Sequence, residues 1–101
     1  MKVPTSFKLG AHTWKIRRKK MHEYYGMCDC DNHIIYISTF VNNKPTTDLE
    51  QFSTFIHELG HAVLSTMGLP DDEQLVRGAE ELFLQIILTS KYAKPKRIKS
   101  V

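Results

Sequence analysis

The sequence predicts an α+β fold, in which a small and mainly antiparallel sheet of three or four strands packs on two helices. Two patterns predict it. Apolar and polar residues alternate along the first half of the chain, as in strands with one buried face. In the second half, apolar residues recur at spacings of three and four, as in amphipathic helices. A length of 101 residues suits one domain. We expect this domain over residues 1–93, followed by a basic tail over residues 94–101.

The first half predicts two hairpins. Residues 7–9 and 13–17 alternate in polarity on either side of a glycine and would form the first hairpin. Residues 24–28 and 34–37 are β-prone and would form the second, because aspartate and asparagine, which favour turns, lie between them. These four segments would build the sheet.

The first helix is expected over residues 48–67. Thr47 or Asp48 can cap it, and a glutamate or glutamine three residues further on would complete a capping box. Gly60 is unusual inside a helix and costs about 1 kcal/mol relative to alanine. Its expected use is a close approach of this helix to the sheet or to a neighbouring backbone. The apolar residues of this helix follow helical spacing: Leu49, Phe52, Phe55, Ile56, Leu59, Ala62, Val63 and Met67.

The second helix is expected to start at residues 70–73, whose acidic side chains suit the positive end of a helix dipole. It would run to about Tyr92, because Pro95 prevents much further extension. Its apolar residues form a wide stripe: Leu75, Val76, Ala79, Leu82, Phe83, Ile86 and Ile87.

The most specific pattern lies within the first helix, where His57-Glu58-Leu59-Gly60-His61 is an H-E-x-x-H sequence. Residues four apart share one helical face, so both histidines can direct their imidazoles at a single metal ion. Glu58 can then reach a water bound to the same ion and act as general base. A catalytic zinc ion needs three protein ligands and one open position for water. The pattern therefore predicts a zinc-dependent metallopeptidase whose third ligand comes from another segment.

Three glutamates of the second helix are candidates for the third ligand: Glu73, Glu80 and Glu81. Glu81 faces away from the apolar stripe, so we expect it in solvent. Glu73 and Glu80 lie on one flank of the stripe, from which a carboxylate can turn back to the first helix. Because Glu73 follows the turn sooner, it would pack closer to His61 if the two helices form a hairpin. The sequence therefore favours Glu73 over Glu80.

A peptidase site also needs a group that stabilises an oxyanion, as a histidine or tyrosine does in many zinc peptidases. The sequence does not choose among the candidates, which are His33, Tyr24, Tyr25, Tyr36 and Tyr92. His12 and His22 have no partners at ligand spacing and are expected at the surface.

Residues 26–87 resemble small zincin metallopeptidases encoded by bacteriophages and mobile elements, related to the ImmA/IrrE type. The resemblance rests on an I-x-I strand at 35–37, a T-x-x-H-E-L-x-H-A helix within 53–62, and a segment over 73–87 that begins E-x-x-V. It implies a minimal zincin-like fold, a zinc ion and Glu73 as its third ligand. It also implies regulatory proteins such as repressors as substrates, cleaved in the cytoplasm of a host cell.

The formal net charge of +3 is concentrated in basic runs at 17–20 and 94–99. We expect the first run to be a solvated loop and the second a solubilising tail. Contact with nucleic acid is a less favoured hypothesis, because no aromatic residues are interleaved with these charges. No apolar run is long enough to span a membrane. The first residues lack the apolar segment of a secretory signal, which favours a cytoplasmic location.

Cys28 and Cys30 are the only cysteines. Two residues apart on a strand, they would point to the same face and yet be poorly placed to bridge each other. We therefore expect reduced thiols, in keeping with the cytoplasm. A metal site of the C-x-C type is disfavoured, because no second cysteine pair exists to complete it.

The leading hypothesis is a peptidase acting on a protein or peptide. The principal alternative is a zinc-containing module that does not cleave and that binds a regulatory protein or nucleic acid. The presence of Glu58 argues against the alternative, because a purely structural zinc site does not need a general base. Hydrolysis of a different bond is a third possibility, since zinc-bound hydroxide is not selective for peptides.

Overall fold

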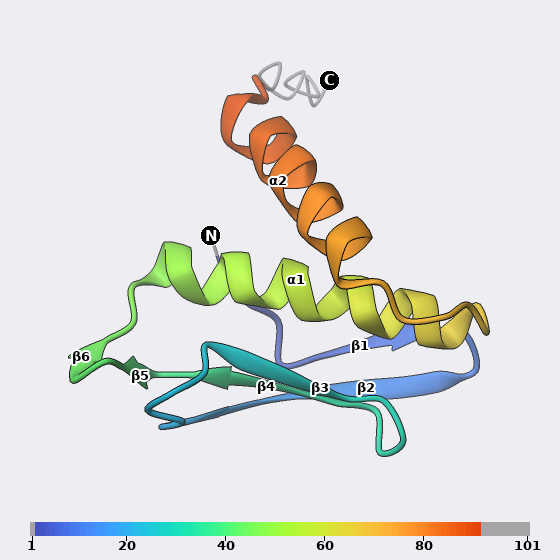
Figure 1. Ribbon diagram of the computed structural model, residues 1–101, viewed down its shortest axis with the longest axis horizontal. Helices are drawn as coiled ribbons and strands as arrows, with labels where there is room; N and C mark the ends of the chain where they lie inside the picture. The colour runs from blue at the N-terminus through green and yellow to red at the C-terminus, as the bar shows by residue number, and fades with distance from the viewer. Residues whose placement is uncertain (1, 92–101) are drawn as a thin grey trace, which may run out of the picture.

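The computed structural model describes residues 2–91 and has the expected α+β architecture (Figure 1). The described part of the chain contains a four-stranded sheet, a two-stranded sheet and two helices. The basic tail expected over residues 94–101 lies outside the described residues. In chain order the elements are β1 (Ser6–Leu9), β2 (His12–Lys19), β3 (Gly26–Asp29), β4 (Ile34–Ser38), β5 (Phe40–Val41), β6 (Lys44–Pro45), α1 (Asp48–Thr66) and α2 (Glu73–Thr89).

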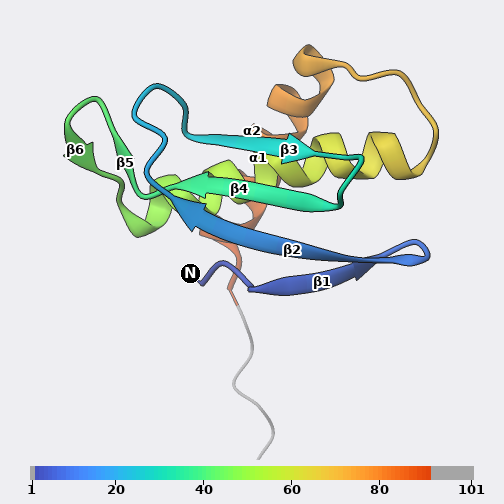
Figure 2. The ribbon, with the colours of Figure 1, turned by 90° about the horizontal axis from the view of Figure 1, so that it is seen from below.

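Both expected hairpins are present, and the larger sheet has the strand order β1-β2-β4-β3. β1 pairs antiparallel with β2, and β3 pairs antiparallel with β4. The two hairpins meet through a parallel pairing of β2 with β4, so the sheet is mixed. Because β4 inserts between β2 and β3, β3 becomes an edge strand (Figure 2). In the described chain, one edge of β3 is thus free of any partner strand.

The core lies between the four-stranded sheet and α1, which crosses one face of that sheet (Figure 1). Trp14 of β2 and Ile35 and Ile37 of β4 are completely or almost completely buried. They pack with Phe55 and Ala62 of α1. Burial of a large apolar side chain contributes roughly 1.5–3 kcal/mol, so this contact fixes α1, and with it the H-E-x-x-H residues, on the sheet.

The start of α1 has the capping box that the sequence predicts. The Glu50 amide donates to Thr47 Oγ1 at 3.1 Å, and the Thr47 amide donates to Glu50 Oε1 at 2.9 Å. The helix ends at Thr66, and Gly68 follows with φ of +70°, a left-handed conformation that glycine adopts at little cost. The first helix is therefore confirmed to within a residue.

The two helices cross where Gly60 of α1 meets Val76 of α2. A Cβ atom on Gly60 would lie 3.0 Å from Val76 Cγ1, so any larger residue here would crowd α2. Gly60 therefore allows a close approach, as expected, and the neighbour is the side chain of Val76. Beyond this crossing α2 rises away from α1 (Figure 1).

The wide apolar stripe of α2 is mostly exposed. Val76 is the one buried residue of α2, and the side chains of Leu82, Phe83 and Ile86 are more than half exposed. Because α2 diverges from α1, its later turns have no described surface to pack on. The side of α2 that carries Val76 and Glu80 faces α1 instead.

The basic run at 17–20 is exposed, as expected, but most of it is strand and not loop. β2 continues beyond the expected end at Arg17 and includes Arg18 and Lys19. Lys19 places its ammonium 4.4 Å from the centre of the Tyr36 ring, and Arg18 donates to Gln51. The last residues of β2 are all basic and do not alternate with apolar residues, so the sequence pattern predicts an earlier end of the strand. Neither described helix is long and apolar enough to cross a membrane.

Candidate metal centre

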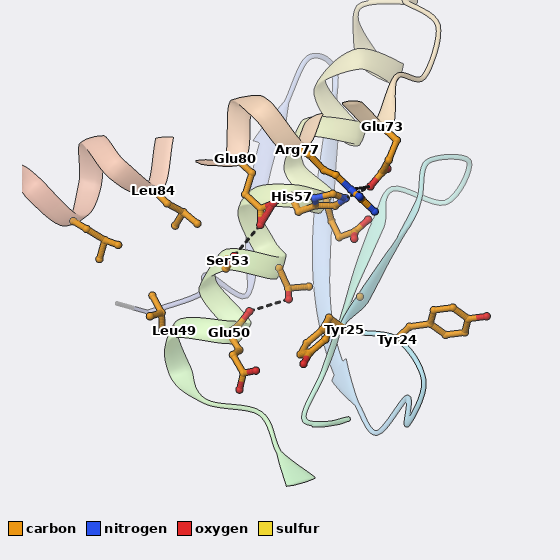
Figure 3. Close-up of a pocket in the computed structure, with 14 residues that line it drawn as sticks. Tyr24, Tyr25, Leu49, Glu50, Ser53, His57, Glu73, Arg77, Glu80 and Leu84 are labelled. Atoms are coloured by element: carbon orange, nitrogen blue, oxygen red, sulfur yellow. Dashed lines mark hydrogen bonds and ion pairs between the residues drawn. The ribbon is translucent and has the colours of Figure 1, made fainter. Parts of the chain in front are cut away.

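His57 and His61 of α1 meet the carboxylate of Glu73, the first residue of α2. His57 Nε2 lies 2.9 Å from Glu73 Oε1, and His61 Nε2 lies 2.8 Å from Glu73 Oε2. Potential ligand atoms of the three residues all lie within 4.8 Å of one another. Figure 3 shows Glu73 reaching from α2 to His57. The sequence placed Glu73 ahead of Glu80 for this position, and Glu73 is the residue that the fold brings to both histidines.

The donor set fits a zinc ion. Two imidazole nitrogens and one carboxylate, with a fourth position open, match the ligand set of many catalytic zinc sites. Around a tetrahedral zinc with bonds of about 2.0–2.2 Å, ligand atoms stand roughly 3.3–3.6 Å apart. Glu73 contacts the two histidines through different oxygens, at 2.9 and 2.8 Å. One ligand atom from each of the three residues lies within 4.8 Å of the others, so the three side chains are close enough to share one ion.

The other ring nitrogen of each histidine is held by a second carboxylate. His57 Nδ1 lies 3.1 Å from Glu80 Oε2, and Ser53 donates to the other oxygen of Glu80 at 2.8 Å (Figure 3). His61 Nδ1 lies 2.5 Å from Asp71 Oδ1. A carboxylate at Nδ1 favours the tautomer with the proton there, which leaves the Nε2 lone pair for a metal. These two carboxylates would thus leave Nε2 of both rings available to a metal ion.

The sequence pattern indicates Glu80 as an alternative metal ligand, but Glu80 contacts the opposite ring nitrogen of His57 from Glu73. The sequence pattern does not indicate the roles of Asp71 and Ser53. An acidic residue in the short turn between two helices was the available signal for Asp71. Glu81 is exposed, as expected.

The electrostatics of the group reflect these contacts. Burial by itself would lower the pKa of His61, but the hydrogen bond and the charge of Asp71 outweigh it and raise that pKa. The slight burial of Glu73 would raise its pKa, whereas His57 and the neighbouring Arg77 together hold it below the usual value. Arg77 Nε donates to Glu73 Oε1 at 3.2 Å on the exposed side. Glu73 is therefore kept ionised, as a metal ligand requires.

Glu58 is buried between α1 and β3, with 8% of its surface exposed. Burial raises the pKa of its carboxyl group, and the charges of His57 and His61 oppose that rise. The absence of a side chain at Gly26 makes room for it, because a Cβ atom there would lie 3.3 Å from Glu58 Cγ. Glu58 thus lies beside the histidines without joining their contacts to Glu73.

Two adjoining hollows flank the candidate centre, with volumes of about 680 and 790 Å³. Both are lined by Gly26, His57, Glu58 and Glu73, so the centre lies where the hollows meet. The first hollow runs along the start of α1 and ends in apolar side chains: Leu49, Leu84 and Leu88. The second follows β3 toward its end. The hollows form one cleft along the free edge of β3, and we refer to it as the cleft.

Cys28 and Cys30 both line the second hollow. Cys28 Sγ and Cys30 Sγ are 3.2 Å apart, so they are in direct contact although no bond joins them. The two thiols are not joined by a disulfide, as expected, but they lie closer together than two positions on one straight strand would, because the chain turns directly after Asp29 and brings Cys30 back. Burial, together with the hydrogen bond to Cys30, raises the pKa of the Cys28 thiol.

The candidates for oxyanion stabilisation are scattered. Tyr24 and Tyr25 line the first hollow. His33 stacks on His12, with ring centres 3.9 Å apart, and Tyr36 lies beneath Lys19. Tyr92 is outside the described residues. Of the candidates in residues 2–91, the two tyrosines before β3 are the ones that the fold brings to the cleft.

Comparisons of this chain with protein-family models, with curated proteins and with solved structures returned no match.

Proposed function

We propose that this protein is a zinc-dependent metallopeptidase with Glu58 as its general base. One observation carries the proposal: the Nε2 atoms of His57 and His61 converge on the carboxylate of Glu73, and a buried glutamate follows the first histidine. Each histidine has its own carboxylate at Nδ1, an arrangement that is typical of metal ligands. The zincin resemblance of the sequence supports the same assignment.

A zinc ion bound by the three residues would acidify a coordinated water and polarise the carbonyl of a substrate. Glu58 accepts the proton of the attacking water and delivers it to the amine that leaves when the peptide bond breaks. His57, His61 and Glu73 hold the metal and take no proton. The role of Asp71 and Glu80 is to orient the two rings.

The substrate in this proposal is an extended stretch of polypeptide. Its backbone pairs with the free edge of β3, which runs beside Glu58 along the cleft. Regulatory proteins such as repressors are the substrate class that the family resemblance suggests. A cytoplasmic site of action belongs to the proposal as well, and the unbonded thiols of Cys28 and Cys30 are in keeping with it.

The test is the replacement Glu58→Gln, which keeps the shape of the side chain and removes its ability to accept a proton. The protein with zinc should cleave members of a random peptide library, with products identified by mass spectrometry. We expect Glu58→Gln to lower the rate by about 10²–10⁴-fold and to retain zinc, measured by atomic emission. The matched control is Glu81→Gln at an exposed position, which should leave both quantities unchanged.

Two results would contradict the proposal. Unchanged cleavage by Glu58→Gln would remove Glu58 as the base. Stoichiometric zinc without cleavage of any peptide or protein by the unaltered chain would favour the module that binds without cutting.

A further inference from the structure

The most unusual surface of this molecule is the side of α2 that points away from the cleft. Leu75, Leu82, Phe83 and Ile86 are each 56–62% exposed there. They surround Gly78 and Ala79, and we call these six residues the outer stripe. Monomeric proteins rarely expose contiguous apolar surface of this kind, and where it occurs it commonly marks a site of association.

The charged residues of α2 lie off the outer stripe. At about 100° per residue, Glu73, Arg77, Glu80 and Glu81 fall on the opposite half of the helix. An uncharged helical face resembles the buried centre of a protein interface, from which charged residues are depleted. The spacing of Leu75, Ala79, Leu82 and Ile86 is four, three and four residues, which is the seam spacing of paired helices.

Gly78, in the middle of α2, also indicates a partner on this face. Glycine inside a helix costs stability relative to alanine, so it usually has a reason. A Cβ atom on Gly78 would meet nothing within 4 Å in its own chain. The contrast is Gly60, where Val76 of α2 supplies the reason. Gly78 and Ala79 together form a shallow notch on α2, which suits the close approach of a bulky side chain from outside.

The outer stripe is complementary to itself. Consider an antiparallel pair of α2 helices whose two-fold axis passes between Glu80 and Glu81. Each residue then faces the residue of the second copy that lies equally far from the axis on its other side along the chain. Leu75 then faces Ile86 of the second copy. Gly78 faces Phe83 of the second copy, and Ala79 faces Leu82 of the second copy. Small residues thus meet large ones at two of these three pairings, which allows the helices to interlock without voids.

In this antiparallel arrangement, the start of one α2 helix and the end of the other carry opposite charges. The start of α2 is acidic, with Asp72 at its cap, and Lys91 follows its last turn. Antiparallel pairing brings Lys91 of the second copy to the acidic start of α2, and it also opposes the two helix dipoles. These features favour a second copy of this chain over an unrelated partner.

We propose that the protein forms a homodimer through the outer stripe of α2. The side of α2 that lines the cleft carries Arg77, Glu80 and Leu84, and it lies away from the seam. The cleft therefore stays open in the dimer. Dimerisation through the outer stripe does not require peptidase activity.

The test measures molecular mass by sedimentation equilibrium, from low micromolar to several hundred micromolar protein. We expect about twice the chain mass of 11.7 kDa at high concentration. Leu82→Glu should raise the dissociation constant by about 30-fold or more. Leu88→Glu is the matched control, because Leu88 is similarly exposed on the same helix but lies off the outer stripe. Circular dichroism verifies that both variants keep their fold.

Disulfide trapping tests the orientation. In a background with Cys28→Ser and Cys30→Ser, chains carrying Ala79→Cys are mixed with chains carrying Leu82→Cys. Antiparallel pairing predicts cross-links between the two kinds of chain in preference to cross-links within each kind. If the protein is a monomer at every concentration, the proposal is wrong, and a different protein would be the partner of the outer stripe. Equal weakening by Leu82→Glu and Leu88→Glu, or no preference in trapping, would overturn it as well.

Discussion

At the scale of single residues, the candidate site is defined by which carboxylate meets which ring nitrogen. Glu73 meets Nε2 of both histidines, while Glu80 and Asp71 each meet one Nδ1. Three acidic side chains with similar chemistry therefore have two different roles. In the proposed zinc centre, the residue at Nε2 would bind the metal itself, whereas a residue at Nδ1 would act through the ring that it orients.

This division predicts an order of zinc affinities among three alanine variants. Glu73→Ala removes a ligand and should lose the most affinity. Glu80→Ala should weaken zinc binding by about 10–100-fold, the usual effect of removing a group that orients a ligand. Glu81→Ala, at an exposed position, is the control and should change nothing. Competition titration with a chromophoric chelator measures all three constants.

The conservative variant Glu80→Gln separates orientation from charge. Its amide oxygen can still accept a hydrogen bond from His57 Nδ1, so we expect it to recover much of the affinity lost by Glu80→Ala. A greater loss in Glu80→Ala than in Glu73→Ala would mean that Glu80 is the ligand and that our assignment of Glu73 is wrong.

At the scale of elements, glycines set how closely α1 approaches its neighbours. Gly60 admits Val76 of α2, and Gly26 lets β3 pass close to α1. A Cβ atom on Gly26 would lie 2.4 Å from Thr54 Cγ2 and 2.8 Å from the Tyr36 carbonyl oxygen. The distance between α1 and the edge strand, and hence the width of the cleft beside Glu58, depends on the absence of that atom.

We therefore expect Gly26→Ala to lower the free energy of unfolding by about 1–3 kcal/mol, as overpacking does in a filled interior. Because β3 must shift away from α1, the variant should also change the cleft and reduce any peptidase activity. Urea denaturation measures the first effect. Gly78→Ala, measured in dilute protein, is the control: it meets open space and should be neutral or stabilising by up to about 1 kcal/mol. Equal stability of Gly26→Ala and the unaltered protein would contradict the close packing.

At the scale of the whole molecule, the candidate centre links α1 to the first turn of α2, which has fewer buried residues than α1. α1 is fixed to the sheet by the core, whereas α2 has Val76 as its one buried residue. Glu73 lies one turn before Val76, so a metal held by Glu73 and the histidines of α1 would fasten α2 at its first turn. Metal binding should therefore stabilise the folded chain as a unit.

Zinc should raise the melting temperature. At free zinc of about 100 times its dissociation constant, the gain is about 2.7 kcal/mol. A domain of this size gains about 4–8 °C per kcal/mol, so the melting temperature should rise by roughly 11–22 °C. A chelator should reverse the gain. His61→Ala is the matched variant, because it removes one ligand and should abolish the shift while the fold remains. Equal shifts in His61→Ala and the unaltered protein would place the zinc elsewhere.

The sequence by itself determined the features that depend on neighbours along the chain. The two hairpins, the capping box of Thr47 and Glu50, and the common face of His57 and His61 follow from turns, caps and periodicity within a few residues. The sequence also limits the candidates for the third ligand of the proposed metal to one flank of α2 and favours Glu73 among them. Local hydrogen bonding and side-chain periodicity are sufficient to produce these features.

The tertiary structure alone decided how these pieces meet. It inserted β4 between β2 and β3, which made β3 the edge of the cleft. It crossed α2 over Gly60, so that Glu73 reached Nε2, Glu80 and Asp71 reached Nδ1, and the apolar stripe of α2 stayed exposed. These outcomes depend on packing between residues far apart in the chain, and the periodicity within one element does not specify the angle at which another element crosses it.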